Sequence, residues 1–100
     1  MKKQNQEHLP TIQNMLEIKP EDRVVKTAEY FKKVKTFLHT YLLKKIGSRV
    51  IQLMFKWGDQ DVKTTIYKSI LQHWKDLIKS KYALHTISKV SAEFEFPRLV

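Results

Sequence analysis

A row of polar and cationic side chains at helical spacing is the strongest chemical signal in this sequence. The row has intervals of four, three and four residues and consists of Lys45, Arg49, Gln52 and Lys56. Residues three and four apart share one face of a helix, so these side chains form a single stripe. Cations in a stripe attract polyanions, and a guanidinium can also stack on a base. The stripe predicts an anion-binding surface; the alternative interpretation is an ordinary solvated face.

The sequence lacks the residue groupings that catalysis or metal binding requires. It has no cysteine and only two glycines, which excludes thiolate sites and glycine-rich phosphate loops. The four histidines stand far apart, without an HExxH motif or paired carboxylates: His8, His39, His73 and His85. Ser48 has no nucleophile elbow around it. We predict a protein that is not an enzyme and that holds no cofactor or metal ion.

The bulk composition is that of a small, basic, folded chain. In 100 residues there are 19 Lys and Arg against 10 Asp and Glu, a formal net charge of +9. This excess favours nucleic acid or acidic protein surfaces as partners, although a lysine-rich solvated surface is the simpler explanation. With 42% hydrophobic residues the chain is too apolar for a disordered tail. No apolar run approaches ~18 residues and the first residues lack a secretory signal, so we expect an intracellular domain without a membrane segment.

Apolar residues recur at intervals of three and four along most of the chain, which predicts helices rather than strands. The proline at position 20 ends the first helix, because proline disfavours helical conformation in the residue before it. Gly58 suits a helix end and Asp59 suits the cap of the next helix. Helices are expected at 5–18, 20–34 with an extension through 37–42, 47–57, 62–71, 74–78 and 82–87, with a tail over 91–100. Trp57, Trp74 and Tyr82 are predicted to be core anchors.

Parts of the sequence repeat with a nearly fixed offset. The segment 81–87 has residues similar in type to those of 45–51, at an offset of 36 residues. The residues around Val62 are likewise similar to those around Val25, at an offset of 37. A period of roughly 20–50 residues built from short helices is typical of an α-solenoid. We predict one all-α helical-repeat domain over 1–100. Its parts are N-terminal helices (10–45), a first clear repeat (46–81), a partial second repeat (82–92) and a tail (93–100).

The repeating region resembles the Pumilio (PUF) repeat family. The stretch IGSRVIQ at 46–52 is similar to the core of a Pumilio repeat, in which a small residue precedes a five-residue RNA-facing motif. The continuation through KWGD at 56–59 and DLIKSKYA at 76–83 is similar to the Puf-A branch of that family. The resemblance is clear over 46–90, extends towards residue 10, and does not cover 91–100.

This resemblance implies a curved stack of three-helix repeats, here about two of them with an N-terminal helical cap. In classical Pumilio proteins the second helices line the concave face and read single-stranded RNA, one base per repeat. Carried over to this sequence, Ser48 and Gln52 form the pair that reads a base edge. Arg49 then takes the place of the stacking residue.

The second copy departs from that pattern, since Leu84, His85 and Ser88 stand at the corresponding places. Leucine cannot hydrogen bond to a base edge, so one intact set cannot specify a sequence. This agrees with the resemblance to the Puf-A branch. That resemblance implies a general binder of RNA or DNA that acts in ribosome assembly in the nucleolus. We expect low-specificity RNA binding, with rRNA or duplex nucleic acid among the targets, in the nucleus or nucleolus. The expected contacts are Lys45, Ser48, Arg49, Gln52, Lys56, Lys81, His85, Ser88 and Lys89.

A rival hypothesis is a helical adaptor that joins a larger protein assembly. Solenoid repeats bury their faces against neighbours, and about two repeats leave an end open. The tail at 93–100 alternates charged and apolar residues and has the composition to cover that end or to dock on a partner. Otherwise we expect self-association or a partner protein. A membrane-surface role is the weaker alternative, because lysines surround the helices and no long helix has a separate basic face.

Overall fold

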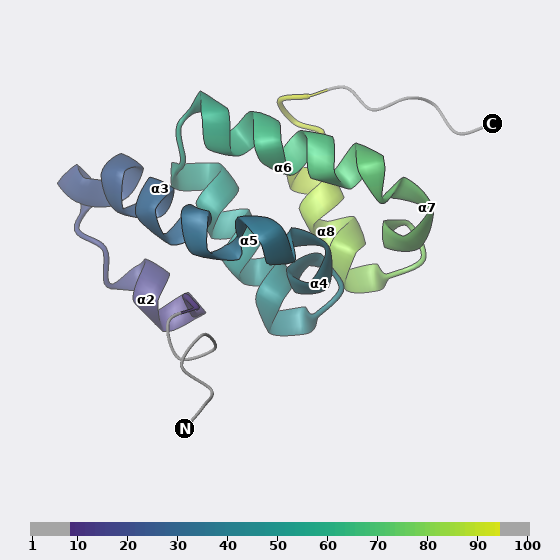
Figure 1. The fold of residues 1–100 in the computed structure, drawn as a ribbon, viewed down its shortest axis with the longest axis horizontal. Coiled ribbons are helices and arrows are strands. Elements are labelled where there is room, and N and C mark those ends of the chain that lie inside the picture. Colours follow the sequence, from purple (N-terminus) through teal and green to yellow (C-terminus); the bar gives the residue numbers. More distant parts are fainter. Residues whose placement is uncertain (1–8, 95–100) are drawn as a thin grey trace.

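The computed structural model describes residues 9–94, and within that range the fold is all-α (Figure 1). The helices are α2 (Ile12–Leu16), α3 (Arg23–Val34), α4 (Leu38–Leu42), α5 (Lys45–Trp57), α6 (Gln60–Gln72), α7 (Trp74–Leu77) and α8 (Lys81–Val90). Short 3-10 turns, η1 (Pro20–Asp22) and η2 (Lys35–Phe37), precede α3 and α4. The all-α prediction is confirmed for the described residues.

Capping side chains set several helix starts where the sequence predicts them. The Asp59 carboxylate accepts a hydrogen bond from the Val62 backbone N–H at 3.0 Å, which confirms Asp59 as the cap of α6. The Ser80 hydroxyl accepts from the Ala83 N–H and caps α8 in the same way. Pro20 opens the 3-10 turn before α3, as predicted from its fixed backbone angle.

The first helix is shorter than the sequence pattern predicts. Residues 5–8 lie outside the described part, and residues 9–11 are not helical. Thr11 has extended backbone angles and caps α2 through a reciprocal pair of bonds with Asn14. This capping box starts the helix at Ile12, so the prediction of a helix from residue 5 is wrong over 9–11.

Both glycines lie where backbones or side chains approach too closely for a Cβ atom. A Cβ on Gly47 would overlap the Tyr41 carbonyl oxygen, because the first turn of α5 lies directly on α4. A Cβ on Gly58 would lie 2.6 Å from the Met54 carbonyl oxygen and 2.7 Å from a Val62 methyl group. Gly58 ends α5 as predicted, and it does so in extended conformation. Its role is to let α6 turn back closely on α5.

Helix α5 is the centre of the fold and packs against α2, α3, α4, α6 and α8. It contributes Val50, Ile51, Met54 and Phe55 to the core, and all four are buried. The other helices, and Ile18 in the turn after α2, add the remaining core residues: Met15, Ile18, Phe31, Val34, Leu38, Leu42, Val62, Ile66, Ile70, Leu77, Ala83, Ile87 and Val90. Trp57 and Trp74 are partly buried and pack on this core, which confirms them as anchors.

Helix starts recur with the offset found in the sequence. Helix α3 begins at residue 23 and α6 at 60, 37 residues later, while α4 begins at 38 and α7 at 74, 36 later. Helix α5 begins at 45 and α8 at 81, again 36 later. Helices α5 and α8 lie side by side and run in the same direction. The first residues of α5 share a hollow with Tyr82 and His85, and the last turns of α5 share one with Lys89.

The chain just after α8 packs against α5 and α6. Residues 91–94 form turns, and the Phe94 ring stacks on Tyr67 with a centroid distance of 4.7 Å. The Glu93 carboxylate accepts a bond from the Lys63 ammonium at 3.1 Å. The prediction of an extended or frayed tail is therefore wrong over 91–94, where aromatic packing and an ion pair hold the chain. Residues 95–100 lie outside the described part.

Candidate nucleic-acid interface

The predicted stripe lies along the outer face of α5, opposite the face that enters the core. Lys45, Arg49 and Lys56 are exposed, and Gln52 is half-buried among them. Val50, Ile51 and Met54 occupy the opposite side and are buried, so the prediction of an amphipathic α5 is correct. Because one face of α5 is packed in the core, the opposite face, which carries the cations, is exposed to solvent.

Packing of α8 beside α5 turns this stripe into one wall of a hollow that we call the basic pocket. It measures about 250 Å³, and its lining combines the two helices: Lys45, Ser48, Arg49 and Gln52 from α5, and Tyr82, His85 and Lys89 from α8. Residues predicted from separate copies of the repeat therefore meet in space. Among the described residues, this lining contains no carboxylate, and none of its three permanent cations takes part in an ion pair.

Ser48, which was predicted to read a base edge, lines the pocket but has its hydroxyl bonded within α5. The residue is only 3% exposed, and its hydroxyl donates to the Lys45 carbonyl oxygen at 3.1 Å. Its own carbonyl oxygen accepts a bond from the buried Thr86 hydroxyl at 3.3 Å. The small side chain at this position allows α8 to pack closely against α5, and contact with α8 covers it.

Gln52 is partly committed to the same helix contact. Its side-chain amide donates to the Thr86 hydroxyl at 3.4 Å, at the long end of the hydrogen-bond range. The amide oxygen of Gln52 remains beside the basic pocket and can accept a bond from a ligand. Gln52 is thus both a link between helices and a polar group of the site.

The remaining predicted residues are distributed around this pocket. Lys81 begins α8, and its ammonium lies 5.4 Å from the centre of the Tyr82 ring. Ser88 is exposed on α8 but does not line the basic pocket. Leu84, at the position that should read a base, is 45% exposed and apolar.

Tyr82 is not a core residue, contrary to the prediction. It is half-buried at the wall of the basic pocket, between the cations of the two helices. It is the second residue of α8, and it is not among the residues that pack on the core. Tyr82 therefore adds an aromatic ring to the lining of the basic pocket, which sequence spacing alone did not reveal.

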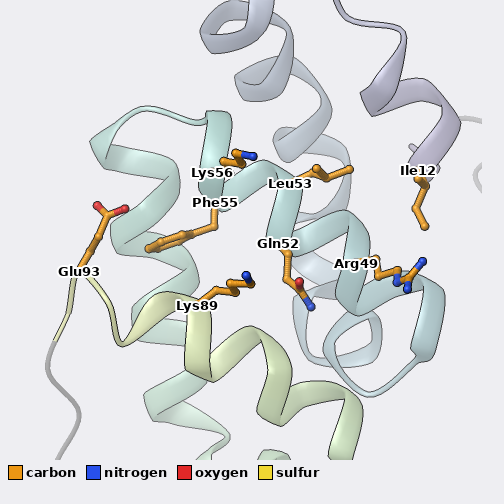
Figure 2. A pocket seen from close by; sticks show the side chains of 8 residues that line it. All are labelled: Ile12, Arg49, Gln52, Leu53, Phe55, Lys56, Lys89 and Glu93. Atoms are coloured by element: carbon orange, nitrogen blue, oxygen red, sulfur yellow. The ribbon is translucent and has the colours of Figure 1, made fainter.

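A second, larger hollow, which we call the apolar groove, runs along α5 away from the basic pocket. It measures about 540 Å³ and is lined by Ile12, Arg49, Gln52, Leu53, Phe55, Lys56, Lys89 and Glu93. Figure 2 shows these side chains spread along α5, from Ile12 and Arg49 at one end to Phe55 and Glu93 at the other. Ile12, Leu53 and Phe55 were not among the predicted site residues, because apolar spacing marks them equally as core.

Two histidines that the sequence separates widely are neighbours in the fold. The rings of His39 and His73 stack with centroids 4.2 Å apart, because α4 packs against α6. The Asp76 carboxylate lies 3.5 Å from His39 Nε2. In the described part of the chain, no three His, Asp or Glu side chains gather in a way that would hold a metal ion.

Two groups near α5 show how the N-terminal segment is attached. The Arg23 guanidinium lies over the Trp57 ring, 4.3 Å from its centre. The Tyr41 hydroxyl donates to the Pro10 carbonyl oxygen at 3.2 Å, and burial raises the pKa of this phenol above its ordinary value of 10.0. Helix α2 itself packs against α5, and its first residue, Ile12, lines the apolar groove.

Comparison of the chain with protein-family models, with curated proteins and with solved structures found no match in any of the three. Within residues 9–94, no helix combines the length and hydrophobicity needed to cross a bilayer. The features of the molecule that bear on its function are the geometry and charge of the two hollows.

Proposed function

We propose that this protein is a Pumilio-like helical-repeat protein, closest to the Puf-A branch, that binds RNA through the basic pocket with low sequence specificity. In this proposal the phosphate backbone supplies most of the affinity, and Tyr82 and His85 stack against bases. Members of the branch that it resembles act in ribosome assembly in the nucleolus, and the proposal extends to that setting.

One observation carries this proposal: cations from two helices that begin 36 residues apart meet in one hollow without a carboxylate among its lining residues. Lys45 and Arg49 come from α5 and Lys89 from α8. A formal charge of +9 on 100 residues adds a long-range attraction for polyanions. Nearby aromatic or imidazole rings suit unpaired bases, since stacking tolerates any base.

The arrangement of helices supports a solenoid of about two repeats with α2 as an N-terminal cap. Three successive helices are followed by three more with offsets of 37, 36 and 36 residues. The equivalent helices α5 and α8 are parallel neighbours, as equivalent helices of stacked repeats would be. Their outer sides then form the RNA-facing surface of the proposed stack.

Low specificity follows from the groups that the surface offers. Ser48 is buried, Gln52 is shared with Thr86, and Leu84 has no hydrogen-bonding group. Few side chains are then free to distinguish one base edge from another, whereas the cations contact phosphate in any sequence.

The test is a fluorescence-anisotropy titration of the chain with single-stranded RNA, duplex RNA and duplex DNA over a series of salt concentrations. We expect binding to single-stranded RNA that weakens steeply as salt rises, with little difference between RNA sequences. Absence of binding at low salt by a chain that is helical by circular dichroism would refute the proposal.

Single substitutions locate the contact. Arg49→Ala should weaken RNA binding at all sequences and lower the slope of log K against log salt by about one. Gln52→Ala should weaken binding less, because phosphate contact dominates. Lys32→Ala removes one exposed cation from α3, outside both hollows, and serves as the charge-matched control. Equal effects of Arg49→Ala and Lys32→Ala would mean that net charge, and not the basic pocket, attracts the RNA.

The adaptor hypothesis has a separate observation in its favour. Leu16, Val24 and Val25 on α2 and α3 are 58%, 52% and 61% exposed, at the end of the stack where a preceding repeat would pack. Exposed apolar side chains at one place suit a protein contact. The two functions are compatible, since this surface and the basic pocket have no residue in common.

A further inference from the structure

We infer that the apolar groove binds an acidic peptide segment that inserts a large apolar side chain. This binding activity goes beyond RNA binding, because its occupant is a protein segment and its walls are largely apolar. A groove of about 540 Å³ has the size of a typical binding site for a small ligand or a short peptide anchor.

The wall of the groove comes from three segments and suits an aliphatic side chain. Ile12 from α2 and Leu53 from α5 are partly buried, so each still has apolar surface to cover. Phe55 is 3% exposed and forms part of the opposite end. A leucine or phenylalanine of a partner would gain apolar contact with this wall, and burial of such a side chain favours binding.

The rim of the groove is cationic, which selects an acidic partner. Arg49, Lys56 and Lys89 line it and are exposed, and within residues 9–94 none of them forms an ion pair. The single carboxylate of the lining, Glu93, accepts a bond from the Lys63 ammonium at 3.1 Å. The groove therefore presents three unpaired cations beside one carboxylate that already has its own partner, and aspartates or glutamates around the apolar anchor would complement them.

The state of the Phe55 ring favours a peptide over a nucleobase in this groove. Phe94 approaches that ring edge-on at 6.0 Å, and the Lys63 ammonium lies 5.5 Å from its centre. With the ring buried in this way, a base would find aliphatic walls and no open aromatic face to stack on. An apolar side chain needs no such face, so the groove suits a peptide better than it suits a base.

The two hollows can be tested separately because each has residues of its own. Ile12, Leu53 and Lys56 line only the apolar groove, and Lys45, Tyr82 and His85 line only the basic pocket. The probe is a fluorescein-labelled peptide of two central leucines with three acidic residues on each side. The control is the same peptide with serines in place of the leucines. A single-stranded RNA is titrated in parallel.

The leucine peptide should bind about tenfold more tightly than the serine peptide, which has the same charge. Ile12→Ser should remove most of that difference while leaving the serine peptide and the RNA nearly unchanged. Lys45→Ala should weaken RNA binding and leave the preference for leucine intact. If RNA binding fails while the leucine preference holds, the proposed function falls and the peptide site stands.

Amide chemical shifts of the unaltered chain give a second measurement that needs no folded variant. Saturation with the leucine peptide should shift the resonances of Ile12, Leu53 and Lys56 more than those of Tyr82 and His85. Equal affinity for the leucine and serine peptides would overturn the inference. Shifts of Ile12 and Leu53 by RNA alone would overturn it too, and would assign the groove to nucleic acid.

Discussion

Arg49 is the side chain at which the two hollows meet. It lies on the exposed face of α5, lines both the basic pocket and the apolar groove, and within residues 9–94 pairs with no carboxylate. Its guanidinium is therefore held in place by a rigid helix but is not neutralised. A planar cation in this state can stack and donate several hydrogen bonds at once, which a lysine cannot do.

The contact between α5 and α8 buries a residue that spacing along the sequence predicted to be accessible. Spacing placed Ser48 on the same helical face as Gln52, and both lie there. It did not reveal that α8 covers Ser48, since Thr86, which contacts it, is 38 residues away in the sequence. The cations were predicted correctly as exposed because a long charged side chain seldom tolerates full burial.

Tyr41 makes stability sensitive to alkaline pH. Burial raises its pKa above 10.0, so the folded state keeps the proton at pH values where the unfolded chain loses it. The stability that this neutral phenol provides is complete below pH 10 and should fall as pH rises through the folded-state pKa. Urea unfolding between pH 9 and pH 11 measures the loss.

Tyr41→Phe should reduce that pH dependence, because phenylalanine has no proton to lose. The variant also removes the hydroxyl bond to the Pro10 carbonyl oxygen, so its stability at neutral pH should fall by about 1 kcal/mol. If the free energy of unfolding falls equally steeply with rising pH in the wild type and in Tyr41→Phe, groups other than Tyr41 cause the loss of stability.

At the scale of elements, the contact of α5 with α4 depends on the absence of a side chain at Gly47. Gly47→Ala would raise helix propensity but would drive a Cβ into the Tyr41 carbonyl oxygen, so the helices must separate. We expect a loss of about 1–3 kcal/mol in the free energy of unfolding. Ser88→Ala on the exposed face of α8 gains propensity without a clash and is the control. If Gly47→Ala instead raised the free energy of unfolding, α5 could move away from α4 without loss of stability.

The start of α6 depends on a single cap. Asp59→Ala removes the acceptor of the Val62 N–H and should cost about 1 kcal/mol of stability. Asp61, two residues on, is also acidic and lies in the first turn but caps nothing, so Asp61→Ala should cost less. Chemical denaturation of both variants separates the cap from the general effect of charge near a helix start.

Element positions were the most predictable part of this fold. Pro20, Gly58 and Asp59 mark boundaries by local chemistry, and local chemistry is readable from sequence. The first helix was predicted too long, since its apolar spacing continues through residues that Thr11 excludes by capping. The apolar groove could not be predicted, because it requires α2 to lie beside α5, a tertiary contact that no local pattern determines.

At the scale of the whole molecule, the fold is a slab with extents of 45 × 34 × 18 Å. The short dimension equals about two helix diameters, so most helices have one side in solvent. This shape explains why a chain of 100 residues can have a complete core and still expose Val24 and Val25 at one end.

That exposed end predicts self-association. We expect the weight-average mass from light scattering to rise with protein concentration, as the apolar ends of two chains cover each other. Val25→Lys should return the chain to a monomer, whereas Leu84→Lys, which alters an exposed apolar residue on α8, should not. A monomer with one cooperative unfolding transition at every concentration would show that this end needs no cover.

The overlap of the two linings has a thermodynamic consequence. Arg49, Gln52 and Lys89 belong to both hollows, so an occupant of one hollow uses cations that an occupant of the other needs. Two such occupants are antagonists, and each raises the apparent Kd of the other in proportion to its own concentration over its own Kd. If both hollows bind the occupants proposed for them, rising levels of one occupant would displace the other without any change of conformation.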